Sequence, residues 1–548
     1  MMRITCVAAA AVMVCSANAQ VVVPPNADPS ALQQRRLDED QRRQELERME
    51  QKPVAKPLQQ TAPVNVAPAM AGELKITVRK LVFSPASEIL AQSELAAKAA
   101  EFEGKRVGIG ELRQLVEQIN AMYSAKGVVT ARAILPPQDL SEGTVTVRLV
   151  EGRIGAIRVN GNATTRENYV LSRVDAAPGK LVDVPALQES LVRFNRTNDV
   201  KLRAELKPGA DFGSTALEIG VLEPERHVFR VGLDNLGSET TGRQRLAVGY
   251  SNRSVLGVRD ALGLGLTSSS GLKSASVDYG FPVTASGGRV TLALSRDETK
   301  LKYGALASLG ITGTSNAGSL SLRQPLLVRD TYQTDLLFSV RKRDVKNLIS
   351  GIPLSATRTD DVQLGVDHVA SDERGQWQAG LSFFSGKSTT AGVGTRYTVS
   401  RGSLRRTQAL AEGWALRGSL SVQHTGSDAL PTGEYFFLGG EGSVRGYPVG
   451  QFAGDRGTVL SLELQHPLGS TDSFGANGFF FVDAGRVSLV RPPNSQLPAS
   501  ESLKSVGWGA NLFVGQNVSA RVTLAYALTK LPEDPKRFTV RFQLNSQF

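Results

Sequence analysis

One arginine in a glycine-rich segment and one aspartate further along the chain have the clearest potential for a specific polar contact. Arg445 lies in segment 437–447, FLGGEGSVRGY, and Asp483 lies in segment 481–485, FVDAG. A guanidinium can hold a carboxylate through two parallel hydrogen bonds, which an ammonium group cannot reproduce. Such a pair would fix a mobile loop against a wall of the protein. The same residues also suit a glycine-rich hairpin loop beside an unrelated turn aspartate, so the rest of the chain must supply the context.

Residue types that support catalysis or metal binding are sparse. The four histidines are far apart and have no metal-ligand spacing. No G-x-S-x-G elbow of a lipase occurs, and Gly386-Lys387-Ser388 lacks the first glycine of a nucleotide-binding loop, where Leu381 stands. We therefore expect no enzyme activity, no cofactor and no metal site.

Residues 1–19 have the pattern of a secretory signal peptide. Arg3 supplies positive charge, residues 7–14 are apolar, and Ala17-Asn18-Ala19 is a small-residue cleavage site. Both cysteines, Cys6 and Cys15, lie in this segment, so the mature chain would contain no disulfide. No later run reaches the roughly 18 apolar residues that a membrane helix requires. We predict an exported chain without a helical membrane span.

The composition indicates a large β protein. The chain has 548 residues, 54 glycines and a formal net charge of +11. That length exceeds one ordinary core, and the many glycines favour a β architecture. For an exported chain, the mild basic excess suggests a polyanionic membrane surface or an acidic partner in a channel. No motif that reads DNA or RNA is present, so we expect no nucleic-acid partner.

Apolar and polar residues alternate along many segments from residue 226 onward, and no helical period competes with this pattern. Period-two alternation produces a strand with one apolar and one polar face. With about 20 residues per transmembrane strand unit, 226–548 accommodates about 16 strands. We predict a membrane β-barrel of about 16 antiparallel strands with a polar lumen, the alternative being a soluble antiparallel sandwich. The final strand carries its apolar residues at Phe538, Val540, Phe542 and Leu544, and the chain ends at Phe548.

Prolines and polar stretches predict the ends of barrel strands. Proline cannot donate to a sheet ladder, so we expect strands to end in short periplasmic turns at Pro282, Pro325 and Pro467. The glycine-rich polar stretches 385–396 and 491–503 are then expected to be outer loops.

Two small α+β modules precede the barrel, at 74–151 and 152–225. Each has a strand, two helical segments and two further strands in that order. In the first module, apolar residues at helical spacing are expected to pack on its small sheet. These are Leu112, Leu115, Ile119 and Met122.

The start of the mature chain has a different character. Within 20–52, residues 30–51 form a charged helix with little apolar face, and 53–73 is a Pro/Ala-rich linker. Such a helix is exposed, disordered or lodged in a polar cavity, and its sequence leaves these alternatives open.

Taken together, these features resemble the two-partner secretion transporters of the haemolysin secretion/activation type, whose periplasmic modules are POTRA domains. The resemblance covers nearly the whole mature chain. Further matching segments are 123–127, 133–140, 151–154 and 234–242. Its most specific residues are Val444, Arg445, Gly446 and Tyr447, with Phe481, Asp483 and Gly485.

The resemblance implies an outer-membrane pore of a Gram-negative cell, with two POTRA domains in the periplasm and the barrel in contact with outer-membrane lipid. Such pores bind an unfolded β-helical exoprotein, for example an adhesin or haemolysin, and secrete it. It also implies that the V-R-G-Y loop enters the lumen, where Arg445 meets Asp483, and that the N-terminal helix occupies the pore at rest. The final strand and Phe548 are a candidate signal for the outer-membrane assembly machinery. The alternatives are an outer-membrane protein assembly factor and a passive porin or receptor barrel.

Overall fold

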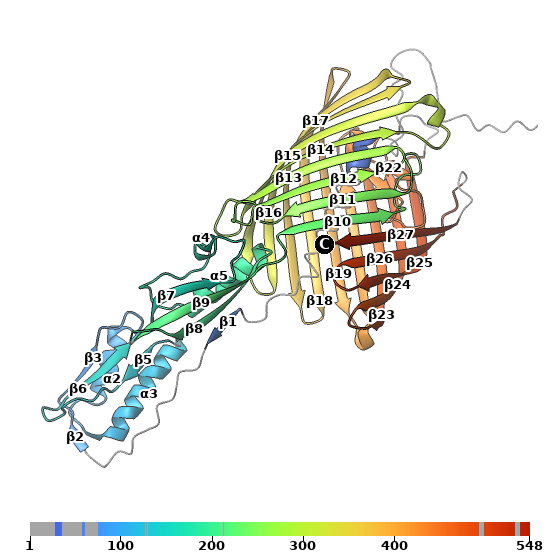
Figure 1. The fold of residues 1–548 in the computed structure, drawn as a ribbon. Helices are drawn as coiled ribbons and strands as arrows, with labels where there is room; N and C mark the ends of the chain where they lie inside the picture. The colour runs from blue at the N-terminus through green and yellow to red at the C-terminus, as the bar shows by residue number, and fades with distance from the viewer. Residues whose placement is uncertain are drawn as a thin grey trace, which may run out of the picture.

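The computed structural model describes residues 28–34, 57–60, 75–126, 128, 130–211, 213–492, 498–531 and 537–548. The predicted signal peptide 1–19 and most of the predicted helix and linker lie outside these residues. The described chain forms a rod of two small domains that leads into one end of a barrel (Figure 1). No helix in these ranges is long and apolar enough to cross a membrane.

The first small domain packs two helices against short strands. Leu112, Leu115 and Ile119 of the second helix are fully buried, and Met122 packs at the edge of the same core. The helical spacing of these residues therefore marks the face that meets the sheet. The elements are β2 (Lys75–Thr77), β3 (Lys80–Ser84), α2 (Gln92–Ala100), β4 (Arg106–Gly108), α3 (Ile109–Ala125), β5 (Arg132–Ile134) and β6 (Thr144–Val150).

The second small domain has a four-stranded sheet of order β1-β8-β9-β7. Its first strand comes from the predicted linker, because β1 (Leu58–Gln60) pairs in parallel with the edge of β8. Asp183 caps the longer helix by accepting a hydrogen bond from the Ala186 amide at 2.9 Å. The remaining elements are β7 (Arg153–Asn160), α4 (Glu167–Leu171), α5 (Val184–Thr197), β8 (Lys201–Pro208) and β9 (Ser214–Leu222).

Sixteen antiparallel strands close into a barrel, which confirms the predicted fold class. Each strand pairs with its neighbours along the chain, except that β20 pairs with β23 across a long excursion and that β10 pairs with β27 to close the barrel. The strands are β10 (His227–Asp234), β11 (Arg245–Asn252), β12 (Ala261–Ser268), β13 (Leu272–Pro282), β14 (Arg289–Lys300), β15 (Ile311–Val328), β16 (Tyr332–Ile349), β17 (Ile352–Asp372), β18 (Gly375–Thr390), β19 (Val393–Ala409), β20 (Ala415–His424), β23 (Arg456–Ser470), β24 (Phe474–Ser488), β25 (Ser500–Val514), β26 (Val518–Ala527) and β27 (Phe538–Gln547).

The alternation along each strand separates a wet interior from an apolar outer face. On β24, Phe480 and Val482 are exposed on the outer face. The next residue, Asp483, faces the lumen and is fully buried. On β27, the apolar residues predicted from the sequence, Phe538 to Leu544 in steps of two, are all exposed on the outer face. The chain end closes the seam, since the Phe548 amide donates to the Phe229 carbonyl at 2.9 Å.

Only one of the three prolines ends a strand as expected. Pro282 is the last residue of β13. Pro325 and Pro467 lie inside β15 and β23, where the pairing register shifts directly after each proline. The residues left unpaired are Leu326 and Leu468, directly after the prolines, and this bulge lets the strand continue past a residue that has no N–H group.

The predicted outer loop 385–396 is wrong. β18 continues to Thr390 and β19 begins at Val393, so only a tight turn with left-handed Ala391 and Gly392 connects them. A strand that extends beyond the lipid is polar on both faces, and the sequence pattern of such a strand resembles that of a loop. The stretch 491–503 is also partly strand, because β25 begins at Ser500.

An ion pair with a buried arginine connects the second small domain to the barrel. The Arg259 side chain, in the turn between β11 and β12, is fully buried and donates from Nε to Asp199 Oδ1 at 3.0 Å. The Ser254 hydroxyl of the same turn donates to the Thr164 carbonyl at 2.8 Å. These contacts fix the end of the barrel that faces the small domains.

Candidate functional site

The excursion between β20 and β23 folds back against the inner wall of the barrel. Residues 425–455 include a short hairpin of β21 (Phe436–Leu438) and β22 (Phe452–Gly454). Leu438 and Val444 are fully buried and pack against inward-facing residues of the barrel strands. A Cβ atom at Gly485 would lie only 2.3 Å from the Leu438 Cδ1 atom, so the wall needs glycine there for the loop to approach.

Arg445, at the tip of this loop, makes the two-pronged contact with Asp483. Arg445 Nε donates to Asp483 Oδ2 at 2.8 Å, and Nη2 donates to Oδ1 at 2.9 Å. The Arg445 backbone amide also donates to Oδ2 at 3.1 Å, and the Ser461 hydroxyl donates to Oδ1 at 2.6 Å. Four donors therefore satisfy a carboxylate that has no exposed surface. The following residue, Gly446, has φ +90°, a conformation that glycine adopts most easily.

A second carboxylate, an aromatic ring and a neighbouring arginine complete the surroundings of Arg445. Its Nη1 atom donates to Glu463 Oε2 at 2.6 Å, and Arg521 Nη2 donates to the same oxygen at 3.0 Å. The Arg445 guanidinium carbon lies 3.5 Å from the centre of the Phe481 ring, and that of Arg521 lies 4.0 Å from the centre of the Phe479 ring. The aromatic rings pack on the faces of the two guanidinium groups, and the carboxylates accept hydrogen bonds from their N–H edges.

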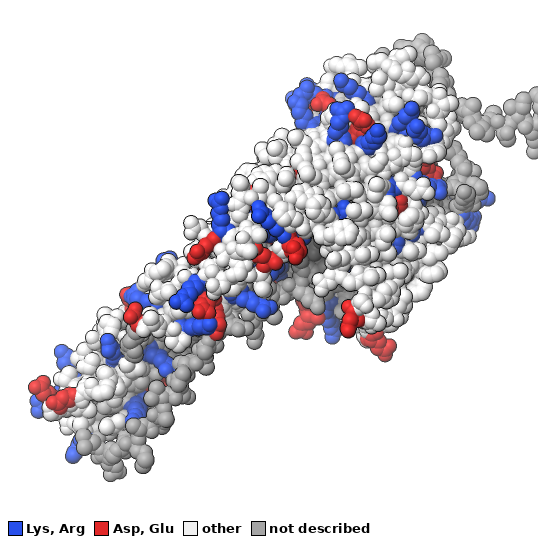
Figure 2. Space-filling model, viewed as in Figure 1, with Lys and Arg blue, Asp and Glu red and all other residues white. Residues whose placement is uncertain are grey.

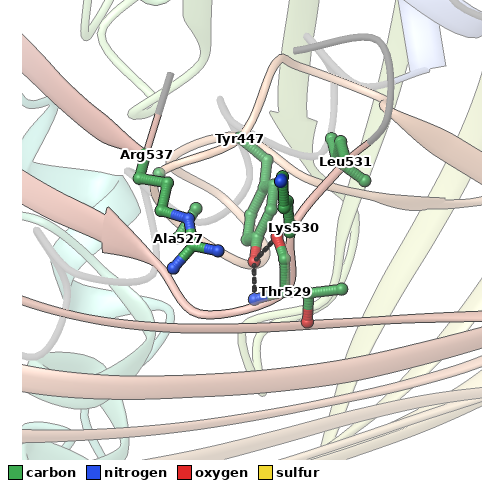
Figure 3. A pocket seen from close by; sticks show the side chains of 7 residues that line it. Tyr447, Ala527, Thr529, Lys530, Leu531 and Arg537 are labelled. Carbon is green, nitrogen blue, oxygen red and sulfur yellow. Dashed lines mark hydrogen bonds between the residues drawn. The ribbon is translucent and has the colours of Figure 1, made fainter. Parts of the chain in front are cut away.

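Tyr447 fixes the outgoing side of the tip. Its hydroxyl donates to the Lys504 carbonyl at 2.6 Å and accepts from the Thr529 amide at 2.9 Å. Figure 3 shows the ring enclosed by the segment that follows β26. The loop tip is therefore attached to β24 through Arg445 and to β25 and the end of β26 through Tyr447.

The base of the loop has a second polar anchor, which we did not predict. Glu434 is fully buried among three arginines of the inner wall. Its Oε1 atom accepts from Arg341 Nη2 at 3.3 Å and from Arg343 Nη1 at 3.4 Å, and its Oε2 atom accepts from Arg401 Nη2 at 2.9 Å. These three arginines are 33 to 93 residues away from Glu434 in the sequence, and no local motif around Glu434 predicts the contact.

Residues 28–34 lie inside the barrel beside this second anchor. They are helical from residue 29 and almost all buried. Gln33 Nε2 donates to Asp297 Oδ2 at 2.7 Å, and the Ser315 hydroxyl donates to Gln33 Oε1 at 2.7 Å. Arg343 contacts both segments, because its Nη2 atom donates to Gln34 Oε1 at 2.9 Å while Nη1 reaches Glu434.

The residues singled out in the sequence thus fall into two groups. Those of the V-R-G-Y loop and of segment 481–485 meet at one place on the inner wall. Those of the final strand lie apart, on the outer face of β27. Within the described ranges, no three His, Cys, Asp or Glu side chains gather as metal ligands would. What the geometry offers is a set of charge-assisted contacts that hold two segments in a polar lumen.

Comparison with known proteins identifies the family. Residues 213–512, more than half of the chain, match the model of the haemolysin secretion/activation protein ShlB/FhaC/HecB, and residues 76–152 match the ShlB-type POTRA domain. The chain belongs to this family. It is therefore an outer-membrane transporter of two-partner secretion, with its POTRA domains in the periplasm.

Individual relatives resemble the chain over most of its length. The heme/hemopexin transporter protein HuxB of Haemophilus influenzae is 25% identical over 465 residues, which cover 79% of this chain and 80% of the relative. The outer membrane transporter CdiB of Dickeya dadantii is 26% identical over 432 residues, 74% of each chain. The solved structure of CdiB from Escherichia coli has a TM-score of 0.67 at 20% identity and covers 96% of this chain and 100% of its own, which shows the shared fold.

Proposed function

We propose that this transporter moves one unfolded, β-helical exoprotein from the periplasm through its barrel to the cell surface or medium. The observation that carries the proposal is the way the lumen is filled. Residues 28–34 and loop 425–455 are held to the wall largely by side-chain hydrogen bonds and ion pairs. Because these contacts are polar, water or the backbone of a passing chain can replace them once the two segments leave the wall.

The exoprotein is expected to bind the POTRA domains by strand addition. An unfolded chain has unpaired backbone groups, and an exposed sheet edge satisfies them with little dependence on sequence. In the second POTRA domain, β1 already occupies the edge of β8, through only three residue pairs. So short a pairing is weak, and the exoprotein would gain this edge by displacing the segment that leads to residues 28–34.

We further propose that transport needs no chemistry by this chain. The pair of Arg445 and Asp483 would hold the loop at rest and release it during passage. Folding of the exoprotein outside the cell would make passage irreversible, since a folded β-helix cannot re-enter the lumen.

Deletion of the gene, followed by proteomics of both the culture medium and the outer membrane, tests the proposal. We expect one large exoprotein to disappear from the medium while other outer-membrane barrels keep their normal amounts. A general loss of outer-membrane barrels would instead indicate an assembly factor. An unchanged medium would indicate a passive pore, and either result would overturn the proposed function. Deletion of residues 74–222 with the barrel retained should reproduce the loss of secretion.

A further inference from the structure

Four of the five longest strands of the barrel, β16 to β19, carry charged residues on their outer face. β15, β16, β17, β18 and β19 have 18, 18, 21, 16 and 17 residues. A membrane crossing takes only about 9–11 residues of a tilted strand. The far ends of these strands therefore project beyond the hydrocarbon layer. Figure 2 shows Lys and Arg side chains, with fewer Asp and Glu, gathered at the end of the barrel that is remote from the POTRA domains.

The strand register places these charges directly above the apolar band. Val340 and Val362 are paired neighbours and are exposed on the outer face. Two residues further out on each strand, Lys342 pairs with Asp360, Asp360 with Lys387, and Lys387 with Arg396. Side chains two residues apart on a strand point to the same face. These four residues consequently form one row around the outside of β16 to β19, immediately beyond the lipid-facing residues.

Positive charge dominates this surface. We use the name basic belt for five cations on the outer face of β16 to β19, which are accompanied by the two carboxylates of Asp344 and Asp360. Lys342 Nζ lies 4.0 Å from Asp360, and Arg358 Nε lies 3.4 Å from Asp360 and 4.0 Å from Asp344. The five cations are Lys342, Lys346, Arg358, Lys387 and Arg396.

Three of the five cations of the basic belt are available to bind an anion. In the part of the chain that the structure describes, Lys346, Lys387 and Arg396 have no ion-pair or hydrogen-bond partner. The side chains of the pairs at Asp360 are about half exposed, at 52–54%. Exposed pairs of this kind are worth little, so they would yield to a stronger anion. Phosphate is such an anion for clustered Lys and Arg side chains.

The position of the belt identifies the anion. The POTRA domains are periplasmic and lie at the opposite end of the barrel (Figure 1). The belt therefore lies on the outer face of β16 to β19 at the level of the head groups of the outer leaflet. We propose that the basic belt binds the phosphate groups of phosphorylated glycolipid of the lipid A type and so fixes this side of the barrel in the outer leaflet. This binding is independent of the secreted protein.

Two other outward-facing cations provide a matched control. Arg486 on β24 and Lys504 on β25 are exposed, but their register partners Thr458, Ser502 and Ala484 are uncharged. Removing one lysine and one arginine there changes the net charge as much as removing Lys387 and Arg396 does. Only the removal of Lys387 and Arg396 interrupts the basic belt.

The test is binding of lipid A to the purified full-length protein in neutral detergent. We expect Lys387→Gln/Arg396→Gln to weaken binding by roughly 30-fold, since each cation close to an anionic surface contributes about a fivefold factor in affinity. Arg486→Gln/Lys504→Gln should leave binding unchanged, and lipid A without its phosphates should bind poorly to the unaltered protein. Heat-modifiable migration of both double variants establishes that their barrels are intact. Equal loss in both double variants, no loss in either, or equal binding of phosphate-free lipid would overturn the proposal.

Discussion

Removal of the Arg445 side chain should release the loop tip without unfolding the barrel. In Arg445→Ala, the fully buried Asp483 loses its counter-ion and two side-chain hydrogen bonds, whereas the hydrogen bonds from the backbone amide of residue 445 and from Ser461 remain. Breaking a buried ion pair costs about 3–5 kcal/mol. Arg521 still neutralises Glu463, and water can enter the polar lumen, so we take the lower end, about 3 kcal/mol. The displaced state of the loop then becomes about 100-fold more populated.

Arg445→Lys separates charge from geometry. Lysine keeps one positive charge but cannot contact Asp483 through two parallel bonds and reach Glu463 at the same time. We expect the population of the displaced state of the loop to increase roughly tenfold, because one or two charge-assisted hydrogen bonds are lost. Secretion should fall in both variants, and more strongly for alanine.

A cysteine at Val444 reports the position of the loop. The Val444 side chain has no exposed surface at rest, so Val444→Cys should react with a water-soluble maleimide only when the tip leaves the wall. The labelling rate should therefore rise about 100-fold when Arg445→Ala is added and about tenfold when Arg445→Lys is added. Arg486→Ala, on the outer face of the strand that carries Asp483, serves as the control and should not change the rate. Equal labelling rates in the Arg445 variants and the control would refute the reasoning.

Three further predictions follow from other contacts. Glu434→Gln removes the charge at the centre of three arginines, including the one that also contacts residues 28–34; planar bilayer recordings should show openings that are severalfold more frequent than in the unaltered protein. Leu58→Asp removes a side chain that packs on the core of the second POTRA domain; partial burial of leucine is worth about 1–1.5 kcal/mol, so the full chain should bind an exoprotein peptide about tenfold more tightly. Phe548→Ala removes an exposed ring while leaving the backbone pair with Phe229 in place; gels should show less heat-modifiable barrel in the outer membrane.

Much of the architecture follows from patterns that are local in sequence. Period-two alternation identifies the barrel and its polar interior, and helical spacing identifies the core of the first POTRA domain. The ends of strands are harder to predict. A proline inside a bulge and a strand that rises out of the lipid both resemble a loop, as Pro325 and the stretch 385–396 show. What decides these cases is pairing with a neighbouring strand, which the sequence of one strand does not contain.

The two anchors of the loop differ in the same respect. Arg445 is conspicuous because it stands among glycines and because a matching aspartate lies in a second recognisable segment. Glu434 has neither signal, and its partners Arg341, Arg343 and Arg401 are inward-facing residues of strands that are full of alternating polar side chains. Any of these arginines suits a wet lumen equally well, so only the closed barrel shows which of them meet one carboxylate.

The central claim is that the exoprotein passes through the lumen, and neighbouring residues of β18 test it most directly. Phe384 points inward and is buried, whereas Phe383 points outward and is 52% exposed. A photoreactive amino acid is placed at one position or the other while an exoprotein fused to a stably folded domain stalls in transit. We predict crosslinks to the stalled exoprotein from position 384 and none from position 383. Crosslinks from position 383 alone, or from neither position while the exoprotein is stalled, would contradict passage through the lumen.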